Sequence, residues 1–177
     1  MKYQPKKYYI KTYGCQANVA DSGTMSGILE SLGFERVVAS KEYANEKEEL
    51  LDLLPQVDLF IINTCSVRQK SEDKVYGLGR VLKEVSERYP GKKPFVLISG
   101  CLVGSVRGDR KRFKFTDLKK KTGWADSYAS PSEIFYLPKI LHKNNLLDEW
   151  ALKKFDAGTV NRFQDDRKQA YVNISSG

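Results

Sequence analysis

Short apolar runs alternate with helical patterns from Tyr8 onward, and this alternation constrains the fold more than any other feature of the sequence. The expected strands are Tyr8–Thr12, Phe34–Ala39, Asp58–Asn63 and Pro94–Ser99, with a short fifth over Asp126–Ala129. An order in which strands and helices alternate predicts a parallel sheet with right-handed crossovers. We therefore expect the α/β class: a parallel sheet of four to five strands flanked by helices, in a Rossmann-like three-layer arrangement.

The main helices are expected from apolar residues that recur every three or four positions. These positions are Met25, Ile28, Leu29 and Leu32 in one helix, and Val75, Leu78, Val81, Leu82 and Val85 in a later one. Asp21 or Ser22 is expected to cap the first of these helices, and Gly33 to end it. Ser66 and Gln69 have the spacing of a capping box for the later helix.

Three further segments carry helical patterns. They are Glu46–Leu54, Pro131–His142 and Leu146–Phe155, and Pro138 is expected to interrupt the second or to start its second part. The single histidine, His142, lies at the end of one of these helices beside a lysine. We expect it to be a surface or capping residue rather than a metal ligand.

Each of the three cysteines directly follows an apolar run. Cys15, Cys65 and Cys101 therefore fall at the carboxyl ends of three expected strands, where sites in parallel sheets are found. Their separations are far longer than the short pairs of zinc ribbons and fingers. If the fold brings the three thiols together, they form a metal-cluster site. The alternative is three unrelated buried thiols, since free cysteine is among the most buried residue types.

The chain carries a net charge of +8, and most of the excess lies between Ser105 and Ala125. Eight Lys or Arg residues stand against two Asp in this segment, interleaved with Phe113, Phe115 and Trp124. Such a patch is typical of a surface that attracts phosphate backbones. The candidate nucleic-acid contacts are Arg107, Arg110, Lys111, Arg112 and Lys114. The alternative is a solvated basic loop without a partner.

The sequence also gives an expectation about compartment. Its first residues show no apolar core of a secretory signal, and its apolar runs are far shorter than the roughly 20 residues of a membrane helix. An odd number of cysteines without an export signal fits a reducing compartment. We therefore expect a cytoplasmic protein without a membrane partner.

Four segments resemble the motifs of the methylthiotransferase family, whose members are radical-SAM enzymes. Tyr13–Asn18 is similar to the first cysteine motif, Ile62–Arg68 to the second, and Gly100-Cys101 to the third. Tyr171–Gly177 resembles the strand before the radical-SAM cysteine loop. The resemblance covers roughly residues 7–142 and the last seven, and the segment after Cys101 departs from the usual family pattern.

The resemblance implies a cofactor and the residues that bind it. It implies that Cys15, Cys65 and Cys101 bind three irons of an auxiliary [4Fe–4S] cluster, leaving the fourth iron open to a sulfur species. S-adenosylmethionine and a second [4Fe–4S] cluster would belong to a further domain. Candidates for hydrogen bonds around the ligands are Gln16, Asn18, Asn63 and Thr64. For these four, capping of strand ends is the alternative.

The resemblance also implies a division of the chain. Residues 1–143 would be the methylthiotransferase N-terminal domain, 144–169 a linker, and 170–177 the first strand of a radical-SAM domain that these 177 residues do not contain. The polar composition of Asp156–Gln169 favours the linker. A lone strand over Ala170–Ile174 cannot be stable by itself. We therefore expect residues 1–177 alone to be inactive, and the sequence assigns no catalytic residue.

The closest branch of the family methylthiolates an N6-modified adenosine next to the anticodon of tRNA. The expected partners are thus the tRNA anticodon stem-loop, together with the radical-SAM and RNA-binding domains of the same full-length chain. Two alternatives remain open. One is a methylthiotransferase that acts on an aspartate of a small-subunit ribosomal protein, and the other is a non-catalytic RNA-binding module with structural cysteines.

Overall fold

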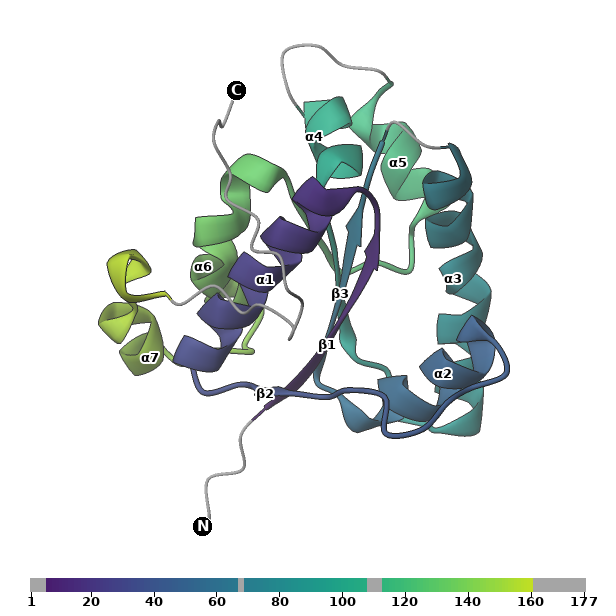
Figure 1. Cartoon of the computed structure of the whole chain (residues 1–177), viewed down its shortest axis with the longest axis horizontal. Coiled ribbons are helices and arrows are strands. Elements are labelled where there is room, and N and C mark those ends of the chain that lie inside the picture. Colours follow the sequence, from purple (N-terminus) through teal and green to yellow (C-terminus); the bar gives the residue numbers. More distant parts are fainter. Residues whose placement is uncertain (1–5, 67–68, 108–112, 161–177) are drawn as a thin grey trace.

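The computed structural model describes residues 6–66, 69–107 and 113–160, and these form an α/β fold around one five-stranded parallel sheet (Figure 1). The strand order is β2-β1-β3-β4-β5, and every neighbouring pair is parallel. The strands are β1 (Lys7–Tyr13), β2 (Glu35–Arg36), β3 (Leu59–Thr64), β4 (Phe95–Ser99) and β5 (Ser127–Ala129). This confirms the fold class that the alternating pattern predicts.

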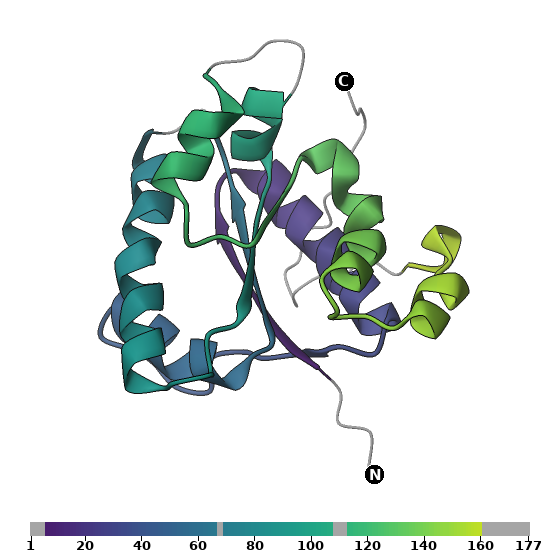
Figure 2. The same ribbon diagram turned by 180° about the vertical axis from the view of Figure 1, so that it is seen from behind.

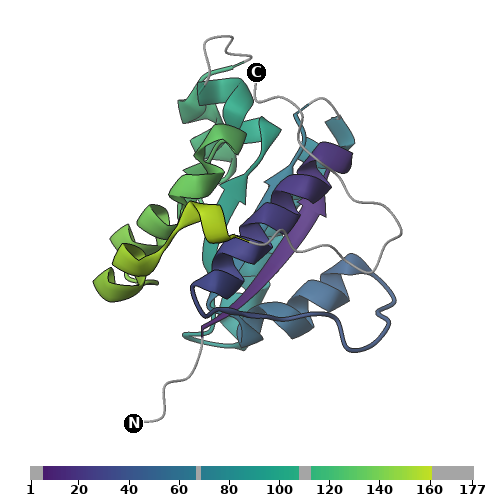
Figure 3. The ribbon, with the colours of Figure 1, turned by 60° about the vertical axis from the view of Figure 1, so that its left-hand side comes forward.

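Helices cover both faces of the sheet, which gives three layers (Figures 1 and 2). The helices are α1 (Gln16–Ser31), α2 (Glu46–Leu53), α3 (Gln69–Arg88), α4 (Cys101–Arg107), α5 (Phe115–Lys121), α6 (Leu137–Lys143) and α7 (Glu149–Lys154). Short 3₁₀ turns occur at η1 (Leu54–Gln56), η2 (Pro131–Tyr136) and η3 (Ala157–Thr159). One face carries α1 and α6, with α7 beside them, and the other carries α2, α3, α4 and α5. Figure 3 shows α1 running along β1, with α6 and α7 in the same layer.

Strand alternation divides the core between these two faces. Tyr8, Ile61 and Leu97 pack with α1 and α6, while Phe60 and Ile98 pack with the helices of the other face. All six residues of β3, the central strand, are buried. Fully burying an apolar side chain of this size contributes roughly 1.5–3 kcal/mol, so β3 fixes the centre of the fold. The strand expected over Asp58–Asn63 is thus present as β3 and is buried on both faces.

The start of the first helix differs from the prediction. α1 begins at Gln16, with Cys15 as its N-cap, so Asp21 and Ser22 lie inside the helix instead of capping it. Cys15 and Asn18 form a capping-box arrangement. The prediction failed because cysteine is not among the residues that ordinarily mark a helix N-terminus.

Several other boundaries also differ. The second strand, expected over Phe34–Ala39, shrinks to Glu35–Arg36, because it lies at the sheet edge and the chain turns outward at the exposed Val38. The helix expected over Pro131–His142 is a 3₁₀ turn followed by α6, which has Pro138 in its first turn. The α-helix expected over Leu146–Phe155 is confined to Glu149–Lys154.

No helix among the described residues is long and apolar enough to cross a membrane. The division of the chain into a domain and a linker stays a prediction. Residues 161–177 lie outside the described part of the chain, as does the strand expected over Ala170–Ile174.

Candidate metal-cluster site

The strand register places Cys15 and Cys65 at the same edge of the sheet. Tyr13 and Thr64, the last residues of β1 and β3, pair with each other. The backbone N–H of Cys65 donates to the carbonyl of Tyr13 at 2.9 Å, so Cys65 continues the ladder by one residue. Cys15 follows Tyr13 by two residues and forms the N-cap of α1.

Cys101 reaches this edge from the neighbouring strand β4. Asn63 pairs with Ser99, and Cys65 and Cys101 each lie two residues beyond this pair. Cys101 is the first residue of α4. In Figure 1 the ends of β1 and β3 lie near the start of α1 and below α4, at the same end of the molecule.

The three thiols differ in exposure. Cys65 is buried, whereas Cys15 and Cys101 are partly exposed. A hollow of about 920 Å³ opens beside Cys101, and Ser66, Ser130 and Glu133 are among the residues that line it. The edge that carries the cysteines is therefore accessible from outside on the Cys101 side.

The neighbouring thiols influence the pKa of Cys101 electrostatically. Burial raises the pKa of the Cys101 thiol above its ordinary value, and the nearby Cys65, Cys15 and Asp21 raise it further. A hydrogen bond with Asn18 acts in the opposite direction. Three thiolates at this edge would repel each other, so a positively charged centre is needed to hold all three deprotonated.

Two buried asparagines connect the segments that carry Cys15 and Cys65. The Nδ2 of Asn63 donates to the carbonyl of Asn18 at 2.7 Å and to Ser22 Oγ at 2.9 Å. The Nδ2 of Asn18 donates to Asn63 Oδ1 at 3.1 Å. The Oδ1 of Asn18 accepts from the Cys15 N–H at 3.2 Å and from the Cys15 thiol at 3.4 Å. This network fixes the start of α1 against the end of β3.

Two glycines, each directly before a cysteine, let the backbone approach this network closely. Gly100 has a φ of +96°, and a Cβ there would overlap Asn63 Oδ1 and the backbone of Thr64. A Cβ on Gly14 would overlap the side chain of Asn18. Only glycine combines this φ with so close an approach, so the backbone before Cys101 packs directly on Asn63.

The structure brings together only part of the residue set predicted around the cysteines. Asn18 and Asn63 are fully buried and bonded to each other, whereas Gln16 is exposed in the first turn of α1. Thr64 is buried, and its hydroxyl donates to the Cys65 carbonyl at 3.4 Å. Ser22 was missed as a network member; its place four residues after Asn18, on the same helix face, is the signal that could have identified it.

Ser99 was also missed. It is fully buried, and its hydroxyl has no hydrogen-bond partner within the described ranges. It lies next to Gly100, two residues before Cys101. No three His, Cys, Asp or Glu side chains of the described residues are arranged to hold a single metal ion.

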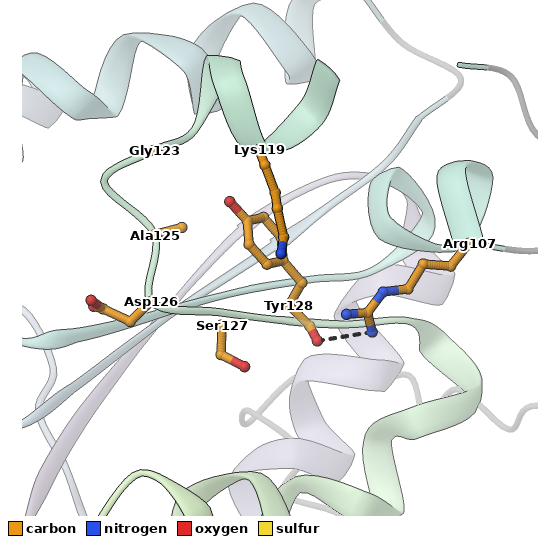
Figure 4. Close-up of a pocket in the computed structure, with 7 residues that line it drawn as sticks. All are labelled: Arg107, Lys119, Gly123, Ala125, Asp126, Ser127 and Tyr128. Carbon is orange, nitrogen blue, oxygen red and sulfur yellow. Dashed lines mark hydrogen bonds between the residues drawn. The ribbon is translucent and has the colours of Figure 1, made fainter. Parts of the chain in front are cut away.

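The basic residues that follow Cys101 in the sequence differ from one another in their contacts. Arg107 ends α4 and donates to the Tyr128 carbonyl at 3.1 Å (Figure 4). It also pairs with Glu133 at 2.9 Å. Lys114 is the exposed N-cap of α5. Arg110, Lys111 and Arg112 lie outside the described residues. The two helices flanking them were not expected from the sequence.

His142 lies in the last turn of α6, with its Nδ1 3.0 Å from the Leu147 carbonyl.

Comparison with known proteins identifies the family. The model of the Uncharacterized protein family UPF0004 matches residues 7–118, more than half of the chain. The chain belongs to this family. The match includes all three cysteines and the two buried asparagines.

Two curated relatives of this UPF0004 member carry the same name. The chain is 31% identical to the tRNA-2-methylthio-N(6)-dimethylallyladenosine synthase of Paenarthrobacter aurescens, with 98% of this chain and 30% of the relative covered. It is 30% identical to the enzyme of that name from Dictyoglomus thermophilum, with 81% of this chain and 33% of the relative covered. The resemblance to methylthiotransferases is therefore confirmed. The chain spans about a third of the length of these relatives.

Replacing Asn63 by leucine is expected to destabilise the chain by about 2–4 kcal/mol, because it removes two buried hydrogen bonds and leaves Asn18 Nδ2 without its acceptor. Urea unfolding measures this change. Asn144→Leu is the control, since Asn144 is partly exposed and, among the described residues, its side chain bonds only the Ile140 carbonyl. A loss of about 1 kcal/mol or less is expected. Equal losses in the two variants would contradict the role given to Asn63.

Proposed function

We propose that this chain is the N-terminal part of a radical-SAM tRNA methylthiotransferase, in which Cys15, Cys65 and Cys101 hold an auxiliary [4Fe–4S] cluster. The observation that carries the proposal is that the three cysteines follow the carboxyl ends of three adjacent parallel strands, at one edge of the sheet. Cysteine thiolates are the usual ligands of such clusters. The names of the relatives support the class of enzyme.

The surroundings of the thiols fit this cofactor. The raised pKa of Cys101 indicates thiols that need a positive centre to be deprotonated together. Cys15 lies at the N-terminus of a 16-residue helix, whose dipole favours a thiolate. The cluster differs from a single-ion site because each cysteine would bind a separate iron. When bound through three cysteines, it would offer a fourth iron to an exogenous sulfur species.

The residues of this chain would act by positioning. Asn18 would hold the backbone and sulfur of Cys15, and Asn63 would hold Asn18 and the backbone before Cys101. The opening beside Cys101 would let a small sulfur donor and the substrate approach. The buried Ser99 hydroxyl would be a candidate donor to a cluster sulfur.

The substrate follows from the relatives. We infer that the full-length protein methylthiolates an N6-modified adenosine of tRNA next to the anticodon. S-adenosylmethionine and the second [4Fe–4S] cluster would be bound by the part of the protein that corresponds to the remaining length of the relatives.

The proposal makes a test on the chain itself possible. Residues 1–177 contain three cysteines and therefore no second cysteine cluster for radical generation. We expect the reconstituted chain to form no 2-methylthio nucleoside from tRNA, S-adenosylmethionine and a reductant, as measured by mass spectrometry of digested tRNA. The full-length protein, as the control, should form it. Product made by the chain alone would contradict the division of labour proposed here, and no product from the full-length protein would contradict the function.

A further inference from the structure

The exposed surface of α5 consists largely of lysine. Lys119, Lys120 and Lys121 are three consecutive exposed residues in its last turn, and we call them the α5 lysine ridge. Leu118, immediately before them, is fully buried in the core cluster that also contains Val106 of α4 and Tyr128 of β5. This anchor fixes α5, so the three ammonium groups project from a packed helix.

The ridge lacks the carboxylate partners that other lysines of the domain have. Within the described ranges, no carboxylate lies within ion-pair distance of any of its three lysines. By contrast, Lys47, Lys93 and Lys153 pair with Glu84, Asp126 and Glu149. Three adjacent positive charges repel each other, and this arrangement becomes favourable when an anion binds.

Aromatic rings hold two of these lysines. The ammonium of Lys121 lies 4.9 Å from the centre of the Tyr76 ring of α3 and 6.0 Å from that of Phe113. The ammonium of Lys119 lies 4.9 Å from the centre of the Phe115 ring. Such contacts reduce the freedom of long side chains, so less entropy is lost when they bind a ligand.

Lys119 also borders a hollow of about 350 Å³ at the outer edge of β5, into which Figure 4 shows its ammonium extending over Tyr128. Two other charged residues line this hollow, and both already have partners. Arg107 binds Glu133 and the Tyr128 carbonyl, and Asp126 binds Lys93 and the N–H of Val96. Lys119 is therefore the cation here without a carboxylate partner among the described residues.

The position of α5 relates the ridge to the cysteines. α5 packs against α4, the helix that begins at Cys101, and both lie at the end of the molecule where the three cysteine segments meet (Figures 1 and 2). A long anion bound along the ridge would therefore pass beside the candidate cluster site.

We propose that the α5 lysine ridge binds the sugar-phosphate backbone of an RNA. The charge of the three lysines and the aromatic rings that support two of them favour a polyanion such as a phosphate backbone. The choice of RNA among polyanions rests on the proposed function. Arg107 is left out of the proposed contact because its guanidinium already binds Glu133 and the Tyr128 carbonyl, so we place the contact on α5.

The test compares two triple variants of the chain in binding a fluorescent RNA stem-loop. The first is Lys119→Gln, Lys120→Gln and Lys121→Gln, which keeps side-chain length and removes three charges. The matched control is Lys83→Gln, Lys92→Gln and Lys139→Gln, which removes three exposed charges elsewhere. Both variants have the same net charge. A difference in their affinity for the RNA therefore shows that the position of the lost charges matters.

We expect the ridge variant to bind the RNA about tenfold or more weakly, and its salt dependence between about 50 and 200 mM to flatten by about 0.7–0.9 per lost contact. The control should lose far less. Equal losses in the two variants, or no loss in either, would overturn the proposal. Iron content after reconstitution and the melting temperature are measured alongside and should be unchanged in both. If the unmodified chain binds no cluster, the proposed function is contradicted. The comparison of RNA binding between the two variants still tests the lysine contact.

Discussion

Replacing any one of Cys15, Cys65 and Cys101 by alanine is expected to remove most of the iron that the reconstituted chain binds. Each thiolate would bind its own iron, so losing one leaves a cluster with two protein ligands, when such clusters normally have four. Iron, acid-labile sulfide and visible absorbance after anaerobic reconstitution measure the effect. Ser105→Ala is the control, because Ser105 lies on α4 with Cys101 and its hydroxyl donates to the Leu102 carbonyl of the same helix.

This result depends on the variants being folded. Cys101 is partly exposed, so its alanine variant should unfold at nearly the same urea concentration as the unmodified chain. Cys15 is also partly exposed but caps α1, so its alanine variant should lose some stability through the lost cap. Cys65 is buried, and its variant should lose some stability through the small cavity it leaves. A folded variant that keeps its full iron content would remove that cysteine from the ligand set.

Gly100→Ala is expected to be among the most destabilising single substitutions, costing about 3 kcal/mol or more. An alanine would have to adopt a φ of +96°, which is strained by about 1–3 kcal/mol, and its Cβ would overlap Asn63 and the Thr64 backbone. Because Asn63 and Thr64 belong to the central strand, they cannot move without disturbing the sheet. The same variant should lose cluster binding, since Gly100 sets the path of the chain into Cys101.

Gly77→Ala provides a control of opposite sign. Gly77 lies in the middle of α3, and nothing approaches within 4 Å of the position its Cβ would take. Replacing an exposed helical glycine by alanine stabilises a protein by roughly 0.5–1 kcal/mol. Urea unfolding of both variants gives the comparison. A Gly100→Ala chain as stable as the unmodified one would contradict the packing described here around Asn63.

The sheet could be predicted because each main strand corresponds to a continuous run of apolar residues in the sequence. β3 reads as buried on both faces, and its position at the centre of the sheet agrees with that pattern. The edge strand β2 was overestimated, since a strand with one neighbour can leave the sheet after two residues. α5 was not predicted because it is only seven residues long. Leu118 is its one buried residue, so the sequence shows no repeating apolar pattern there.

The position of the three cysteines at one edge of the sheet was predictable, whereas the side chains that surround them were less so. The position of each cysteine after an apolar run predicts the shared edge, because parallel strands end on the same side. Asn18 and Asn63 are linked to each other across 45 residues, and no local pattern predicts which polar side chains meet at that distance. Gln16 illustrates this limit, since it adjoins Cys15 in sequence and faces solvent in the structure.

The most direct test of the account is the iron and acid-labile sulfide content of the unmodified chain after anaerobic reconstitution, with Mössbauer spectroscopy to identify the cluster. The account predicts about four irons and four sulfides per chain, in a single [4Fe–4S] species with one iron unlike the other three. Well under one cluster per chain in a folded and fully reduced sample, or a single bound metal ion in its place, would contradict it.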